Sequence, residues 1–400
     1  MRIFTICNKS PWPPTEGGSI AMNSIIEGLL KAGHQVKVLA VSSDKHPIIM
    51  ENIPEAYRKK TGFETTYLTL TPRPWDAFLN LFTRKSYHIQ RFISKEMEKK
   101  IIRILTENEF DIINLEMLHV TPYIHVIRKF SKARIILRAH NIEHLIWERI
   151  AASTRNPIKR AYLTYLASSL KRYELHILKE VDGLAAITPV DGAFFRRQQP
   201  GLPVADIPFG ITPRPSPPEV EEEFPALFHL GSMSWMPNSD GIRWFLDNVW
   251  PLVNRKYPHL KCYLAGRGMP QWLLERKDPN IINVGEVADA RKFMRSKPIM
   301  IVPLLSGSGI RIKIIEGMQE GRTIISTTIG AEGICYTPGK DLLIADTPEA
   351  FVQMIEKAIH DRAFCKQIGR NAQKTISQVY DNRVITDHLI SFYQSLSSER

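Results

Sequence analysis

The chain has 400 residues, of which 44% are hydrophobic and 24% charged, a composition that is typical of globular proteins and excludes a largely disordered chain. Its length exceeds what one hydrophobic core usually supports, so we expect two domains of roughly 200 residues each. The four cysteines are scattered singly with no CxxC pair, which argues against a zinc site or a disulfide framework. No apolar run reaches the roughly 18 residues needed to span a bilayer, and the first residues lack the long apolar core of a signal peptide, so we expect a cytoplasmic protein.

The formal net charge of +12 is concentrated in the first half of the chain. Residues 1–212 carry 30 Lys and Arg against 20 Asp and Glu, whereas residues 213–400 carry 23 against 21. The excess cations cluster in helix-like segments that begin at Arg84, Ile127 and Arg155. Such segments are either solvated helix faces or a surface that faces something anionic, namely lipid headgroups or nucleic acid.

Short β-branched or apolar segments alternate with helix-like stretches in the first half. These segments span residues 2–7, 35–41, 111–115, 134–138 and 183–188. Alternation of this kind predicts βαβ units around a buried parallel sheet.

Two glycines, Gly17 and Gly18, follow the first predicted strand and open a helix with apolar residues at helical spacing. They either form a tight turn or let a ligand approach backbone N–H groups, which favour negative charge at a helix N-terminus. The segment matches neither GxGxxG nor GxxxxGK[ST]. A hydride-transfer enzyme and a P-loop NTPase therefore lose their main support.

Residues 213–225, PRPSPPEVEEEFP, are rich in Pro and Glu and are predicted to be a linker between domains. Beyond them the strand-helix alternation recurs, with predicted strands at residues 226–231, 260–266, 281–285, 299–305 and 323–328. We therefore predict an α/β fold with two Rossmann-like, doubly wound domains, residues 1–212 and 226–375, and a C-terminal helix, residues 376–400, that packs on the first domain. In such folds ligands bind outside the carboxyl ends of the strands, so a site in the cleft between the domains is expected.

The segment LLSGSGIRIKIIEGMQEGRTIISTTIGAEGI, residues 304–334, combines small residues, cations and a glutamate. A buried strand leads into the loop 306–309, and Arg311 and Lys313 follow at the start of a helix. Two cations at a helix N-terminus are unfavourable for the helix dipole, and the diphosphate of a nucleotide would balance them. Glu316, one turn further on, would accept hydrogen bonds from a ribose diol.

This segment resembles the donor site of the GT-B-fold retaining glycosyltransferases of family 4. Other segments of the chain are also similar to conserved segments of that family. They are PPTEGG followed by LLKAGHQVKVL, IPFGI at 207–211, and HLGSMSW, LAGRG and NVGEVAD in the second half. The resemblance implies a GT-B fold and the transfer of a sugar, with retention, from a nucleotide-diphosphate sugar to a glycan or lipid-linked acceptor in cell-surface polysaccharide or glycolipid biosynthesis. The donor-binding residues that it implies are Gly17, Gly18, Gly231, Gly268, Val287, Ser306, Gly307, Ser308, Gly309 and Glu316.

Three residues are predicted to be catalytic. The family often has a histidine beside the reacting sugar at the strand end that here reads LRAHNIEHLIWER, and His140 matches it; a core histidine is the alternative. Arg311 and Lys313 would balance the leaving diphosphate. No DxD pair occurs in the chain, so neither a metal nor a cofactor is expected beyond the donor substrate. Two departures from the family are Ser308, where a first glutamate is usual, and the lack of a basic pair in GSMSWMPN.

Other interpretations stay open. A GT-B-fold epimerase acting on the nucleotide sugar would use the same donor site, and a non-catalytic relative would bind it without transfer. A nucleic-acid partner is not expected, because no helix-turn-helix, zinc or RNA-recognition signature is present. The cationic segments that also carry Phe92, Ile93, Tyr162 and Tyr165 predict peripheral contact with an anionic membrane at its inner face.

Overall fold

The computed structural model describes residues 1–14, 17–71, 75, 80, 83, 85–211, 220–307 and 310–397. The chain forms two compact units, Met1–Thr212 with Asn382–Arg400, and Pro213–Asp381. We call them the first and the second domain. Most of the predicted linker lies outside the described residues. The chain returns to the first domain at Asn382 rather than at residue 376, because the preceding helix continues to Val379.

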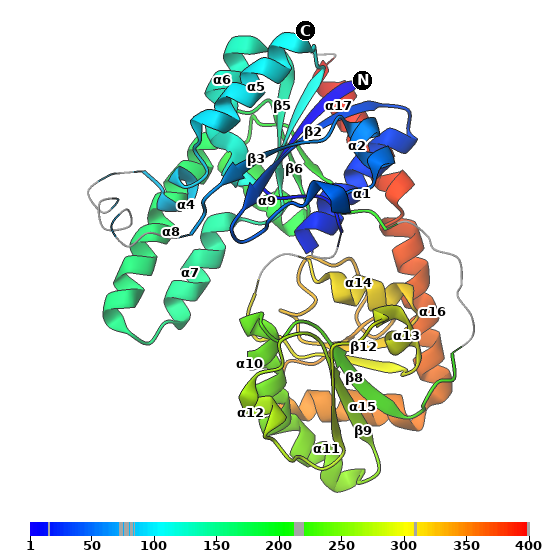
Figure 1. Ribbon diagram of the computed structural model, residues 1–400. Helices are drawn as coiled ribbons and strands as arrows, with labels where there is room; N and C mark the ends of the chain where they lie inside the picture. The colour runs from blue at the N-terminus through cyan, green and yellow to red at the C-terminus, as the bar shows by residue number, and fades with distance from the viewer. Residues whose placement is uncertain are drawn as a thin grey trace. The chain divides into compact units, whose positions relative to one another are not determined.

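The first domain is built on a seven-stranded sheet with the order β3-β2-β1-β4-β5-β6-β7, and every strand pair is parallel. Parallel neighbours need crossover connections, and the crossover helices cover both faces of the sheet (Figure 1). The strands are β1 (Arg2–Cys7), β2 (Gln35–Ser43), β3 (Glu64–Leu68), β4 (Ile112–Glu116), β5 (Arg134–Ala139), β6 (Gly183–Ala186) and β7 (Val204–Asp206).

Several helices of the first domain begin at side chains that cap the free N–H groups of the first turn. Ser94 caps α5, Asn156 caps α8 and Thr188 caps α9, and in the last two a proline follows the cap. The helices are α1 (Gly17–Lys31), α2 (Glu55–Thr61), α4 (Tyr87–Gln90), α5 (Lys95–Glu107), α6 (Ile124–Phe130), α7 (Glu143–Ser153), α8 (Pro157–Ile177), α9 (Pro189–Gln198) and α17 (Asn382–Ser397), with 3-10 turns at Met50–Asn52 and Leu118–Tyr123.

The second domain has a six-stranded parallel sheet with the order β10-β9-β8-β11-β12-β13. Its strands are β8 (Ala226–Leu230), β9 (Lys261–Ala265), β10 (Ile281–Gly285), β11 (Ile299–Val302), β12 (Thr323–Ser326) and β13 (Leu343–Ile344). Its helices are α10 (Met236–Trp244), α11 (Trp250–Lys256), α12 (Gln271–Leu274), α13 (Ala290–Arg295), α14 (Ile312–Gln319), α15 (Pro348–His360) and α16 (Arg362–Val379), and a π-helical turn at Phe245–Val249 joins α10 to α11. The predicted α/β class with two doubly wound domains is confirmed.

The C-terminal helix α17 packs against α1 of the first domain. A Cβ at Gly28 would overlap the Thr386 side chain, so glycine allows the two helices to approach closely. Asn382, the first residue of α17, donates from its side chain to the Ser24 carbonyl at 2.8 Å and from its backbone to the Ile211 carbonyl at 3.0 Å. The start of α17 is thus fixed to both α1 and the segment 207–211 that resembles the family.

Candidate active site

Glycines at the carboxyl ends of β8 and β9 bring their loops together in the second domain. Gly231 follows β8 and donates its N–H to the Ala265 carbonyl at 3.0 Å. A Cβ at Gly266, where φ is +145°, would overlap the Gly231 carbonyl oxygen. Gly268, with φ +67°, lies so close to the Ser234 hydroxyl that a side chain would collide with it. The predicted donor residues Gly231 and Gly268 therefore lie in neighbouring loops at one edge of the sheet.

Lys313 of α14 reaches this edge and is held there by two side chains. Its Nζ donates to Asn238 Oδ1 at 2.6 Å and lies 3.3 Å from His229 Nε2. His229 is fully buried and its Nδ1 lies 2.9 Å from the Ile301 carbonyl, which can only accept a hydrogen bond. Nδ1 therefore carries the proton, and Nε2 presents a lone pair to the Lys313 ammonium.

Gly231 lies directly beside this cation. A Cβ at Gly231 would be 2.8 Å from Asn238 Nδ2, 3.0 Å from Lys313 Nζ and 3.3 Å from His229 Nε2. Any side chain at this position would displace the lysine or its partners. The absence of a side chain leaves the Lys313 ammonium next to bare backbone at the carboxyl end of β8.

Burial and the nearby Arg311 charge lower the pKa of Lys313 to about 7. Burial and the Lys313 charge lower the pKa of His229 well below its ordinary value, so this imidazole is neutral at pH 7. Within the described residues, the hydrogen-bond partners of the Lys313 ammonium are an amide and a neutral imidazole, and no carboxylate pairs with it. An anionic ligand at this position would raise the pKa of Lys313 again, because it favours the charged form.

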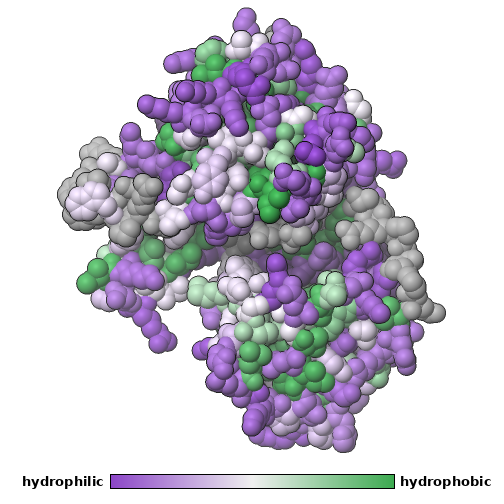
Figure 2. All heavy atoms as spheres, viewed as in Figure 1, coloured by the Kyte–Doolittle hydropathy of each residue, from purple (hydrophilic) through white to green (hydrophobic). Residues whose placement is uncertain are grey.

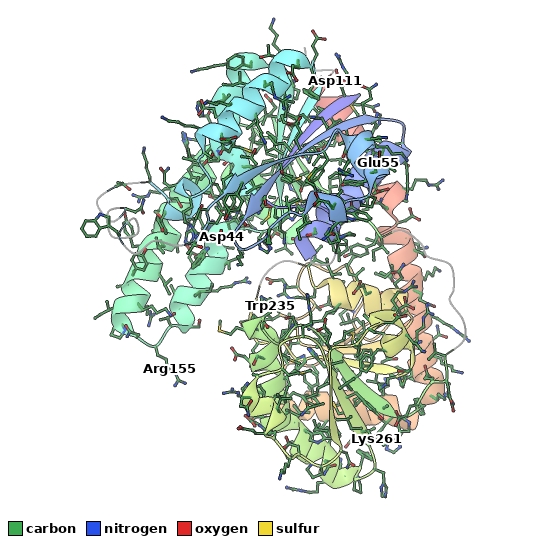
Figure 3. All side chains as sticks on the ribbon, in the orientation of Figure 1. Asp44, Glu55, Asp111, Arg155, Trp235 and Lys261 are labelled. Atoms are coloured by element: carbon green, nitrogen blue, oxygen red, sulfur yellow. The ribbon has the colours of Figure 1, made fainter. Side chains whose placement is uncertain are left out.

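Arg311 is the N-cap residue of α14 rather than its first helical residue. Its guanidinium is buried, with 4% of the residue exposed, and its Cζ lies 5.6 Å from the centre of the Trp235 ring. Figure 3 labels Trp235 at the start of α10. A Cβ at Gly307, where φ is +123°, would be 3.0 Å from Arg311 Nη2, so Gly307 lies directly beside the guanidinium.

The other predicted donor residues have different positions. Ser306 is exposed after β11, and Glu316 is partly exposed on α14, one turn after Ile312. Val287 is partly exposed in the loop between β10 and α13. Ser308 and Gly309 lie outside the described residues.

In the first domain, Gly17 is the first residue of α1 and Gly18 contacts Lys9. A Cβ at Gly18 would be 2.9 Å from Lys9 Cε and 3.2 Å from Lys9 Nζ. Lys9 follows β1, so its cation lies at the N-terminus of α1, at the carboxyl edge of the sheet. The glycine pair thus makes room for a lysine side chain.

His140 follows β5 and bonds to Glu116, the last residue of the neighbouring strand β4. His140 Nε2 lies 2.7 Å from Glu116 Oε2, and Asn114 Nδ2 donates to Glu116 Oε1 at 2.8 Å. Arg138 Nη1 lies 3.3 Å from Glu116 Oε2 and 3.2 Å from the Ala21 carbonyl of α1. Arg138 and Glu116 are both fully buried, and 7% of His140 is exposed.

The charges of this group follow from its contacts. Burial raises the pKa of Glu116, but Arg138 and the hydrogen bond from His140 outweigh it and hold this pKa below its usual value. Burial lowers the pKa of His140, although Glu116 opposes the shift, and Arg138 and Lys9 add to the lowering. A neutral His140 facing an ionised carboxylate donates through Nε2–H, so its Nδ1 carries a lone pair that can accept a hydrogen bond.

Two neighbouring histidines have structural roles instead. His144 is fully buried, and its Nδ1 lies 2.5 Å from Glu174 Oε2, while Glu174 also accepts the backbone N–H groups of Glu143 and His144. Glu174 of α8 thus caps the start of α7. The ring of His119 packs on Phe92 at 4.7 Å, and burial lowers the pKa of His119 to about 4.

In the ranges that the structure describes, no group of three or more His, Cys, Asp or Glu side chains is arranged to hold a metal ion. A cavity of about 1180 Å³ lies in the first domain and is lined by Arg2, Gln35, Tyr57 and Phe110, among others. Since Arg2 and Gln35 begin β1 and β2, this cavity lies at the amino ends of the strands. It is therefore separate from His140, which lies at their carboxyl ends.

Four residues that lie beside the predicted site residues were not predicted from the sequence. His229 and Asn238 hold Lys313, Trp235 lies beside Arg311, and Lys9 lies beside Gly18. One signal was present, because His229 interrupts the apolar strand ALFHL and a buried polar residue in such a strand needs a partner. The others depend on loop geometry.

Residues 225–361 match the family described as "Glycosyl transferases group 1". A Klebsiella pneumoniae protein named "Uncharacterized 44.6 kDa protein in cps region" is 23% identical over 406 residues, which covers 96% of this chain and 97% of that protein. The Staphylococcus aureus "Capsular polysaccharide biosynthesis glycosyltransferase CapM" is 21% identical over 194 residues, 45% of this chain and 50% of CapM.

Solved structures share the fold over the whole chain. Sucrose-phosphate synthase from Thermosynechococcus elongatus superimposes with a TM-score of 0.71 at 14% identity and covers 100% of both chains. Anabaena Alr3699/HepE in complex with UDP superimposes with a TM-score of 0.65 at 14% identity, covering 99% of this chain and 100% of HepE. At these identities the likeness shows the fold, which is the GT-B arrangement of glycosyltransferases. Together, the group 1 match over residues 225–361 and the GT-B fold identify an enzyme of the glycosyltransferase type.

Proposed function

We propose that this enzyme transfers a sugar from a nucleotide-diphosphate sugar to a glycan or lipid-linked acceptor, without a metal ion and with retention at the anomeric carbon, in the synthesis of a cell-surface polysaccharide. The observation that carries the proposal is the Lys313 ammonium, held by His229 and Asn238 beside the bare backbone of Gly231. A cation that is held by a neutral amide and a neutral imidazole is suited to an anionic ligand.

The diphosphate of the donor would occupy the space beside Lys313 and Arg311. In the transfer, the acceptor hydroxyl oxygen bonds to the anomeric carbon, the bond from that carbon to the diphosphate oxygen breaks, and the hydroxyl proton is released. Negative charge grows on the leaving diphosphate, and the two cations stabilise it. Because protein cations supply this stabilisation, and because the chain has no DxD pair, the proposal requires no divalent ion.

Glu316 would bind the ribose of the donor, as in the family that the segment resembles. It lies on α14, three residues after Lys313, so the two side chains share one side of the helix. A carboxylate accepts two hydrogen bonds from a ribose diol, whereas the lysine holds the diphosphate. This division of roles predicts that replacing Glu316 weakens nucleoside recognition and leaves the charge balance of the diphosphate intact.

His140 would bind a sugar hydroxyl of the reacting partners. Its Nε2–H is directed to Glu116, which Arg138 and Asn114 hold in place, so the lone pair on Nδ1 is available to accept a hydrogen bond. Glu116 is engaged by three side chains, which makes it a positioning residue and a poor nucleophile.

The relatives are consistent with this proposal. HepE is described in complex with UDP and, in other crystals, with UDP and glucose or with UDP-glucose. The Klebsiella relative is named for its place in a cps region, and CapM for capsular polysaccharide biosynthesis. We therefore choose uridine diphosphate sugars as the first donors to test and capsule-type glycans or their lipid-linked precursors as the first acceptors.

The test is an incubation of the enzyme with a labelled nucleotide sugar in excess EDTA, with and without an acceptor extract. Transfer of label to the acceptor, together with release of nucleoside diphosphate, supports the proposal. Conversion of the donor to a stereoisomer without any acceptor would instead show an epimerase. Binding of the donor without either product would show a non-catalytic relative. The matched variants are Lys313→Met and, as a control at an exposed lysine of the same domain, Lys292→Met.

A further inference from the structure

Helices α7 and α8 form a hairpin that extends from the body of the first domain (Figure 1). Its base is fixed where Glu174 of α8 caps the start of α7. Its turn is also well defined, because Asn156 Oδ1 accepts the Lys159 N–H at 2.9 Å and Pro157 follows the cap. We call residues 154–160 the hairpin tip. At 1.5 Å per residue, α8 carries the tip about 30 Å from its other end.

The hairpin carries only positive charge over most of its length. Between Glu148 and Glu174 the sequence contains no Asp or Glu. Its cations in this stretch are Arg149, Arg155, Lys159, Arg160, Lys171 and Arg172. Lys171 lies 3.5 Å from Glu148, near the base, so part of the charge there is neutralised.

The cations of the hairpin tip are exposed to solvent. Arg155, Lys159 and Arg160 are all exposed, and none of them forms an ion pair within the described part of the chain. Figure 3 labels Arg155 at the end of the hairpin, where its side chain points away from the domain. Figure 2 shows this end of the hairpin as mostly hydrophilic with a small hydrophobic patch.

An apolar side chain lies among these cations. Ile158 is 82% exposed, the highest value among the exposed large hydrophobic residues of the described chain. Of the four apolar residues predicted for a membrane contact, Phe92 is buried, Tyr162 and Tyr165 pack against the apolar cluster between the helices, and Ile93 is 50% exposed. Unlike these four residues, Ile158 lies at the hairpin tip.

We propose that the hairpin tip docks on an anionic lipid bilayer. Three exposed cations would contact the headgroups, and Ile158 would enter the boundary between headgroups and acyl chains. Charge complementarity favours a surface of anionic lipids, because the stretch between Glu148 and Glu174 has no carboxylate that would be repelled. No helix among the described residues is long and apolar enough to cross a membrane, so this contact is peripheral.

The hairpin tip lies close to the proposed acceptor site along the chain. Helix α7 begins at Glu143, three residues after His140, and its eleven residues lead to the tip over about 16 Å. A bilayer at the tip would therefore lie within roughly two or three helical turns of the proposed acceptor site. The choice of a lipid-linked acceptor rests on the proposed function, whereas the docking itself does not.

The test is co-sedimentation of the full chain, without donor or acceptor, with vesicles of phosphatidylcholine containing one quarter phosphatidylglycerol and with pure phosphatidylcholine. The first variant replaces Arg155, Lys159 and Arg160 by Gln, and its matched control replaces Lys31, Lys60 and Lys129, three exposed lysines elsewhere on the same domain. The second is Ile158→Gln, with Ile49→Gln as its control, since Ile49 is 56% exposed.

We expect binding to the anionic vesicles at low salt, weaker binding at physiological salt and little binding to neutral vesicles. The triple tip variant should bind about 100-fold more weakly and Ile158→Gln roughly tenfold more weakly, with both controls near wild type. Absence of sedimentation with anionic vesicles at low salt overturns the proposal, as does equal loss in the lysine control. Binding of a nucleic acid by the tip, with no vesicle binding, also overturns it. Because no turnover is measured, these outcomes are independent of transferase activity.

Discussion

Replacing Lys313 by Met removes the charge of this side chain and keeps most of its length. In the proposed complex, Lys313 makes a charge-assisted hydrogen bond to the diphosphate, which is typically worth about 1.5 to 3 kcal/mol. The dissociation constant of a nucleoside diphosphate should therefore rise roughly 10-fold to 150-fold at pH 7. Isothermal titration calorimetry measures it directly, and Lys292→Met, at an exposed lysine of α13, should bind as wild type does.

The wild-type affinity should also depend on pH in a defined direction. The pKa of Lys313 is about 7 without ligand, and an adjacent diphosphate raises it, so binding above pH 7 takes up a proton. Affinity should fall between pH 7 and pH 9 by up to about 50-fold, as the fraction of charged lysine falls from about one half to about one hundredth. The diphosphate is already ionised in this window and adds little to the change.

The Lys313→Met variant shows whether the pH dependence of the affinity comes from the titration of Lys313 or from another group. In Lys313→Met the affinity should be nearly constant between pH 7 and pH 9. Calorimetry in two buffers of different ionisation enthalpy should show proton uptake on binding by wild type and little uptake by the variant. If wild type binds equally well at pH 7 and pH 9, and the variant binds equally tightly, Lys313 does not contact the diphosphate and the donor site has been placed wrongly.

Three further predictions concern single residues. Gly231→Ala should weaken nucleoside-diphosphate binding by about tenfold or more, because the new Cβ meets Asn238 Nδ2 at 2.8 Å; unchanged calorimetric affinity would contradict this. Glu116→Gln leaves the fully buried Arg138 without its carboxylate and should destabilise the fold by about 3–5 kcal/mol in denaturant unfolding, whereas a near-neutral effect would mean that the pair is dispensable. The pKa of Glu143 is raised to about 8 by burial and by Glu174, so the native state keeps a proton that the unfolded chain loses above its ordinary pKa, and stability falls as pH rises from about 4.5 to 8. Glu143→Gln should therefore gain melting temperature over wild type at pH 8 and gain less at pH 5; an equal difference at both pH values would count against the raised pKa.

The sequence predicted the buried parallel strands well because their patterns are strong. The expected strand at 2–7 appears as β1 with the predicted bounds, and the apolar run IMIV forms the fully buried β11, which ends at Val302 rather than at the predicted residue 305. The strands that were missed, β3, β7 and β13, are short or contain polar residues, ETTYL in the case of β3. All three are outermost strands of their sheets, where fewer side chains are buried and the apolar pattern is weak.

The candidate site was predicted only in part, for a similar reason. Cations that follow a strand are visible in the sequence, and Arg311 and Lys313 were predicted that way, whereas Gly231 was predicted from the family resemblance. The partners that hold Lys313 come from β8 and α10, 84 and 75 residues away along the chain, and only the fold brings them together. The same holds for Glu116, whose hydrogen bond sets which nitrogen of His140 carries the proton.

Metal-independent transfer with retention is tested most directly by an NMR assay of the reaction in excess EDTA. The enzyme is incubated with a nucleotide-diphosphate sugar and an acceptor glycan, and the anomeric signals of donor and product are followed together. We expect a glycoside product that keeps the anomeric configuration of the donor, release of the nucleoside diphosphate without added metal, and a large loss of rate in Lys313→Met. Transfer that stops in EDTA and returns with manganese would contradict this expectation, because the leaving diphosphate would then depend on a metal ion rather than on Arg311 and Lys313.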